Sequence, residues 1–107
     1  MNDAEAAVTE ARRLFNEEQY WYVHEALEKV WLKRQGEEKA LLQGLIIAAA
    51  SLVHWQKGEL AVCWRMMSDA VVRLTGKQDL YYGWDVRAFR DHLKSCAERR
   101  EWLRLQV

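Results

Sequence analysis

The fold of this chain is decided by the stretch Leu41-Leu42-Gln43-Gly44-Leu45-Ile46-Ile47-Ala48-Ala49-Ala50-Ser51-Leu52-Val53, which has no polar face. A surface helix carries an apolar stripe on one side, whereas a helix that is apolar nearly all round is normally buried. Gly44 and the three alanines keep this helix slim, so neighbouring helices can approach it closely. We therefore predict a central buried helix from Glu37 to about Lys57, ending at Gly58.

Helical periodicity continues on the N-terminal side of this stretch. Asn2 or Asp3 can cap a first helix. Its inner face would hold Ala4, Ala7, Val8, Ala11, Leu14 and Phe15. A second helix is predicted from Glu18 or Tyr20 to Gln35, because Gly36 is a natural C-terminal stop.

Two further helices are predicted on the C-terminal side. The first carries an apolar stripe of Leu60, Trp64, Met67, Val71 and Leu74 and ends at Gly76. Residues 76–84 form the one substantial loop, and Asp85 caps the last helix. The inward residues of that helix are expected to be Val86, Phe89, Leu93, Cys96 and Leu103.

No alternating strand pattern occurs, so the chain is predicted to be all-α. The expected architecture is a single compact five-helix bundle with a central buried third helix, covering residues 1–107 as one domain. Half of the residues are hydrophobic, which suffices for a core without metal or disulfide staples.

Composition narrows the functional classes. The 16 basic and 16 acidic residues cancel, which argues against nucleic-acid binding. The acidic residues around Arg99, Arg100 and Arg104 indicate a solvated helix face. No signal peptide is recognisable, and no apolar run reaches the roughly 20 residues that a membrane helix needs. Cys63 and Cys96 show no metal-ligand spacing, so we expect buried free thiols in a cytoplasmic protein.

The second predicted helix contains the run Tyr20-Trp21-Tyr22-Val23-His24-Glu25-Ala26-Leu27-Glu28-Lys29-Val30-Trp31. At about 100° per residue, His24 and Glu28 fall inside an apolar arc that has aromatic residues on both sides. Burying an ionisable pair is costly unless the pair is satisfied, so it is predicted to be a structural lock or a site. Glu25, four residues before Lys29, is expected in an exposed ion pair on the outer side.

The central helix offers two polar partners for this pair, Gln43 and His54. They lie eleven residues apart, so they share a line but stand about 16 Å apart along the axis. In an antiparallel hairpin through Gly36, we expect Gln43 beside Glu28, and His54 beyond His24 toward Tyr20.

These motifs resemble a known family. The segment Tyr20-Trp21-x-x-His24-Glu25-x-Leu27-Glu28-x-x-Trp31 is similar to the signature of domain-of-unknown-function family 309. Further likeness lies in Leu42-Gln43-Gly44-Leu45-Ile46-x-x-Ala49-Ala50 with His54 and Gly58, and in Tyr82-Gly83-Trp84-Asp85. The resemblance spans roughly residues 14–95 and implies a small all-α cytoplasmic protein without an established activity.

Three interpretations of the His24–Glu28 pair and its polar partners remain open. The candidate site residues are His24, Glu28, Gln43, His54, Tyr20 and Trp31. The first is a buried network in which His24 donates to an ionised Glu28, and Gln43 or a tryptophan N–H completes the bonds. The alternative is a metal-dependent hydrolase centred on His24, Glu28 and His54, since His and Glu four apart on a helix can share an ion. The third is a small-ligand pocket among the tryptophans.

The leading expectation is a non-catalytic interaction or ligand-binding module with no resident metal or cofactor. No Gly-x-Ser-x-Gly turn exists, and a Cys63–His54 dyad would have no spacing signature. The chain contains six tryptophans, of which Trp84 and Trp102 have the weakest claim to burial. We expect one of them to lie on an apolar surface through which the protein forms a homo-oligomer.

Overall fold

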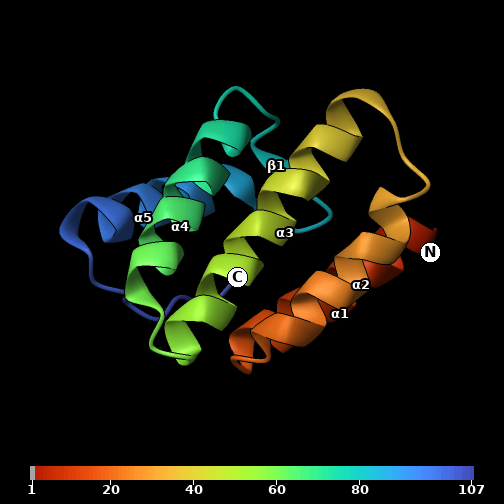
Figure 1. The fold of residues 1–107 in the computed structure, drawn as a ribbon. Helices are drawn as coiled ribbons and strands as arrows, with labels where there is room; N and C mark the ends of the chain where they lie inside the picture. Colours follow the sequence, from red (N-terminus) through yellow and green to blue (C-terminus); the bar gives the residue numbers. More distant parts are fainter. Residues whose placement is uncertain (1) are drawn as a thin grey trace.

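The computed structural model describes residues 2–107 and contains five helices, as predicted. They are α1 (Asp3–Asn16), α2 (Tyr20–Trp31), α3 (Gly36–Gln56), α4 (Leu60–Leu74) and α5 (Val86–Arg99). Figure 1 shows the α1–α2 hairpin on one side of α3 and α4 on its other side. None of the helices within residues 2–107 is long and apolar enough to cross a membrane.

Helix α3 is the buried centre of the bundle, as its lack of a polar face predicted. Nine of its residues are buried: Leu41, Leu42, Gly44, Leu45, Ile46, Ala48, Ala49, Ser51 and Leu52. A Cβ atom at Gly44 would lie 2.6 Å from Leu74 Cδ2, so the close packing of α4 on α3 depends on glycine there. Ser51 is the one buried polar residue of the described core, and its hydroxyl donates to the Ala48 carbonyl at 2.6 Å.

The predicted N-terminal caps are present. The Asn2 side chain accepts a hydrogen bond from the Glu5 amide at 2.7 Å, and Asp85 accepts one from the Ala88 amide at 2.9 Å. Each satisfies an amide that has no partner inside its helix.

Helix α2 ends earlier than predicted, at Trp31 rather than Gln35. The Leu32 amide still bonds four residues back, but the amides of Lys33 and Arg34 bond to carbonyls only three residues earlier, at 2.9 and 3.2 Å. This tighter turn brings Arg34 to Asp3 of α1 and Glu38 of α3, with shortest distances of 2.6 and 3.1 Å. The predicted end of α2 at Gln35 was wrong because the actual end depends on contacts of Arg34 with α1 and α3, which the local sequence pattern does not show.

Two short strands lie within the segment that was predicted as a loop without strands. β1 (Leu80–Tyr81) pairs antiparallel with β2 (Trp84–Asp85). Tyr82 and Gly83 between them have φ angles of +46° and +82°, as a tight two-residue hairpin turn requires. Strands of two residues are too short to show an alternating pattern, so the sequence carried no signal for them.

An aromatic cluster around Phe15 joins α1 to the C-terminal half of the chain. The rings of Tyr20, Trp84, Phe89 and Trp102 all meet Phe15 edge to face, with centroid distances of 5.1 to 6.3 Å. Trp84 is fully buried and Trp102 is 8% exposed, so the predicted apolar surface around these two tryptophans does not exist. The homo-oligomer prediction thereby loses the surface on which it was based.

The C-terminal tail explains why Trp102 is buried. Arg100 adopts a left-handed conformation (φ 52°) and ends α5, so the tail leaves the helical path and Leu103 is 46% exposed instead of facing inward. The Val107 amide donates to Asn16 Oδ1 at 2.6 Å, and Arg12 Nε donates to the Val107 carbonyl at 2.8 Å. The tail is therefore bonded to α1, which closes the aromatic cluster.

Candidate functional site

A pocket of about 220 Å³ lies between α2 and α3. Its lining residues are Trp21, His24, Ala50, Val53, His54 and Lys57. The histidines come from different helices, so the fold brings together two of the predicted site residues that lie 30 positions apart in the sequence. The alanine and valine give the pocket an apolar side.

Trp21 forms an aromatic wall of this pocket. Its ring stacks on that of His24, with a centroid distance of 5.6 Å and an interplanar angle of 23°. The indole N–H donates to Glu25 Oε1 at 3.0 Å, which holds the ring although the residue is 54% exposed. Glu25 therefore supports Trp21 and forms no ion pair with Lys29, in contrast to the prediction.

Each histidine of the pocket has a carboxylate beside it. His54 Nδ1 lies 2.8 Å from Glu59 Oε1, within hydrogen-bond distance. His24 Nδ1 lies 3.8 Å from Glu28 Oε2, which is too long for a hydrogen bond, and no other described group bonds this buried nitrogen. His24 thus keeps one buried polar atom without a partner, whereas His54 is fixed.

The charge of the lining is positive. Lys57 is the one side chain in the lining that carries a permanent charge, and no carboxylate of residues 2–107 lies within ion-pair distance of it. The nearby carboxylates of Glu25, Glu28 and Glu59 are not among the lining groups. An anion could therefore meet a lysine and two imidazoles without facing a carboxylate in the lining.

The predicted buried His–Glu–Gln network is not formed, because Glu28 is 47% exposed. The buried residues of α2 are Tyr20, Val23, Leu27 and Val30. The centre of this face lies about 80° from His24 and about 120° from Glu28 at the helical step per residue. His24 is therefore at the edge of the buried arc, and Glu28 lies beyond it.

The remaining predicted site residues lie elsewhere. Tyr20 belongs to the aromatic cluster, and burial raises the pKa of its hydroxyl. The nearby Trp102 N–H lowers this pKa in part, although it does not reach hydrogen-bond geometry with the hydroxyl. Trp31 is about 10 Å further along α2 from His24, and Lys39 Nζ covers its ring at 4.3 Å. Gln43 is half-buried and makes no side-chain hydrogen bond with other described residues.

The three-ligand centre of the hydrolase alternative is not formed either. Among residues 2–107, no three histidine, cysteine or carboxylate side chains are close enough to share a metal ion. Glu28 lies beside His24, whereas the carboxylate beside His54 is that of Glu59. His24, Glu28 and His54 therefore do not surround one point. Both cysteines are buried free thiols, as predicted, and burial raises the pKa of Cys63 to about 11.

Trp21 and Lys57 were missed as members of the site. A signal existed, because Trp21 lies three residues before His24 and Lys57 three residues after His54. Residues three apart are neighbours on a helix surface. The two triplets face one pocket because α2 and α3 pack against each other, and this cannot be read from either triplet alone.

These features define a small helical-bundle protein with a pocket between its second and third helices that is lined by Lys57 and two histidines. The chain belongs to the family described as a domain of unknown function (DUF309), whose model matches residues 8–66. The match includes all of the residues that line the pocket and stops before the hairpin and α5.

A solved structure supports the same fold. The chain is similar to the crystal structure of a conserved hypothetical protein from Thermus thermophilus, with 34% sequence identity and a TM-score of 0.73. The similarity covers 84% of this chain and 94% of that chain. Comparison with curated proteins gives no significant match.

Proposed function

We propose that the protein is a non-catalytic binding module whose pocket between α2 and α3 takes a small organic anion. The observation that carries this proposal is the lining itself, in which Lys57 and two histidines stand beside the Trp21 ring with no carboxylate among them. An acidic group would meet Lys57, and a flat apolar part would contact Trp21, Ala50 and Val53.

The size of the pocket limits the ligand. At about 220 Å³ it is smaller than the roughly 300–1,000 Å³ of pockets for drug-sized molecules. A single ring with one carboxylate or phosphate is the class of ligand that suits this volume. The buried His24 Nδ1 without a partner gives the ligand a polar group to which it could bond, directly or through water.

Binding is favoured over acyl-transfer catalysis because the described lining has no hydroxyl or thiol nucleophile. Ser51 and Cys63 are completely buried, and neither lines the pocket. The His54–Glu59 pair resembles the base of a catalytic triad but has no hydroxyl or thiol in the lining to activate. The free thiols Cys63 and Cys96 support the cytoplasmic location that we propose.

The test is a titration of the labelled protein followed by NMR at the Trp21 indole N–H. The probes are benzoate, phenyl phosphate and the neutral analogue benzamide. Both anions should shift the Trp21 signal and bind more tightly than benzamide. Lys57→Gln should weaken the binding of benzoate about fivefold, because a partly exposed ionic contact contributes up to about 1 kcal/mol.

The matched control is Lys94→Gln, which removes an exposed lysine from α5 and should leave benzoate binding unchanged. Equal affinity for benzoate and benzamide would contradict the proposal. So would a Lys57→Gln variant that binds benzoate as tightly as the natural protein.

A further inference from the structure

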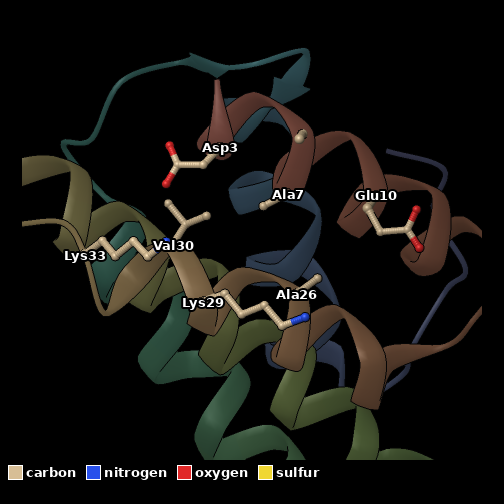
Figure 2. A pocket seen from close by; sticks show the side chains of 8 residues that line it. Asp3, Ala7, Glu10, Ala26, Lys29, Val30 and Lys33 are labelled. Atoms are coloured by element: carbon tan, nitrogen blue, oxygen red, sulfur yellow. The ribbon is translucent and has the colours of Figure 1, made fainter. Parts of the chain in front are cut away.

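A groove of about 410 Å³ runs between α1 and α2, away from the anion pocket. It is lined by Asp3, Ala6, Ala7, Glu10, Ala26, Lys29, Val30 and Lys33. Figure 2 shows Ala7, Ala26 and Val30 between the two helices. On α2, its residues point about 150° away from Trp21 and His24, so the groove and the pocket occupy different sides of the helix.

The two sides of the groove carry opposite charges. Asp3 and Glu10 lie on α1, whereas Lys29 lies on α2 and Lys33 in the turn that follows α2 (Figure 2). Asp3 is already bonded to Arg34, and Glu10 to Arg13. Among residues 2–107, neither Lys29 nor Lys33 has a carboxylate within ion-pair distance, so the basic side has no acidic partner within this chain.

We propose that a second copy of this chain packs onto the α1–α2 groove about a two-fold axis parallel to the two helices. Such an axis places α1 of each copy over α2 of the other, so the acidic side of one groove faces the basic side of its partner. The floor of alanines and one valine allows the helices to approach closely.

The charge pattern favours a two-fold axis parallel to the helices over one that runs across the groove. A two-fold axis across the groove would place α1 over α1, with acidic side chains facing each other, and α2 over α2, with lysines facing each other. Like charges in an interface are unfavourable. Rotation about the parallel axis does not shift residues along the helices. Within each copy, Asp3 contacts Arg34, which is next to Lys33, so Asp3 and Lys33 lie at the same level. Asp3 of one copy would therefore lie opposite Lys33 of the other copy.

Sedimentation equilibrium of the full chain at micromolar concentration and low salt tests this proposal. The natural protein should be a dimer, and high salt should dissociate it because the contacts are between exposed charges. The double variant Lys29→Glu/Lys33→Glu should be monomeric. The control, Arg87→Glu/Lys94→Glu, makes the same change of net charge at exposed positions of α5 and should remain dimeric.

A charge exchange separates the proposed geometry from a general effect of charge. The variant Asp3→Lys/Glu10→Lys should also be monomeric, but its equimolar mixture with Lys29→Glu/Lys33→Glu should form a heterodimer. Because Asp3→Lys also breaks the contact to Arg34, a second variant is needed in case that chain fails to fold. Ala6→Trp fills the groove from an exposed position and should give a folded monomer.

A natural protein that is monomeric at every concentration would overturn the proposal. A dimer that survives both Lys29→Glu/Lys33→Glu and Ala6→Trp would overturn it as well, because its interface would have to lie elsewhere. Neither outcome affects the anion pocket, whose test depends on Lys57.

Discussion

The aromatic cluster around Phe15 and the pocket beside Trp21 are both built from tryptophan, yet they differ in burial. Trp84 and Trp102 come from a hairpin and a tail, and both are buried. Trp21 comes from a helix whose pattern is strongly apolar, and it is 54% exposed. The cluster collects rings from α1, α2, the hairpin, α5 and the tail, whereas the pocket is formed by two helices and Lys57. Aromatic residues are thus used for stability in the first region and, in our proposal, for binding in the second.

The largest expected difference between the regions is in stability. Trp84→Ala should lower the free energy of unfolding by about 3–5 kcal/mol, because it leaves a large cavity in the core. Trp21→Ala should change it by less than about 0.5 kcal/mol, since surface substitutions rarely do more. Urea denaturation of both variants measures the contrast. Similar losses for the two would show that Trp21 is as much a part of the core as Trp84.

The second test addresses the tail that closes the cluster. Trp102→Ala should cost about 3 kcal/mol, the lower end of the range for buried tryptophan, because Trp102 is 8% exposed at the edge of the cluster. Leu103→Ala, next to it and 46% exposed, is the control and should be nearly neutral. If thermal melts place both variants within experimental error of the natural protein, the tail does not hold the cluster together.

Loss of the carboxylates that lie beside the pocket should change the stability of the protein only slightly. Glu28→Ala and Glu25→Ala should each cost less than about 1 kcal/mol, because exposed ion pairs and hydrogen bonds contribute little. If Glu28 were paired in a buried network, as the sequence suggested, its loss would cost about 3–5 kcal/mol. Denaturant midpoints of the two variants decide between these values, and a large loss for Glu28→Ala alone would restore the buried network.

The smallest effect appears only at alkaline pH and belongs to the core. Burial raises the pKa of Cys63 from 9.0 to about 11, so folding favours the neutral thiol. The stability that this provides is complete below about pH 9 and is lost as the pH rises toward 11. Burial, reinforced by the hydrogen bond to Glu38, also raises the pKa of Tyr81, which adds to the alkaline loss.

Cys63→Ala should therefore show a flatter dependence of unfolding free energy on pH between 9 and 11 than the natural protein. The stability of each protein at neutral pH serves as the reference for its own curve, since the substitution also removes a buried atom. Parallel curves for the two proteins would mean that the thiol makes no contribution to the alkaline loss.

The helices could be predicted because their signals are local. The absence of a polar face marked α3 as the centre, and the oxygens of Asn2 and Asp85 marked the starts of α1 and α5. The end of α2 and the 80–85 hairpin could not be predicted in the same way. The first depends on contacts of Arg34 with two other helices, and the second is too short to show a period.

The candidate site was predicted only in part. His24 and His54 were identified as polar residues near apolar faces, and they do line one pocket. Glu28, Gln43, Tyr20 and Trp31 were grouped with them because a helical projection gives angles but not the centre of the buried face. That centre depends on which neighbours pack against α2, and it lies toward Val23 and Leu27.

By itself, the sequence determined the number and order of the helices, the buried position of α3 and the presence of two buried free thiols. These follow from periodicity, capping and composition, which act over a few residues. Only the tertiary structure decided which tryptophans are buried, which charges stay exposed and which face of α2 meets α3. Those outcomes depend on contacts such as Phe15 with Trp102 and Arg12 with Val107, between residues nearly the whole chain apart, and no local pattern encodes them.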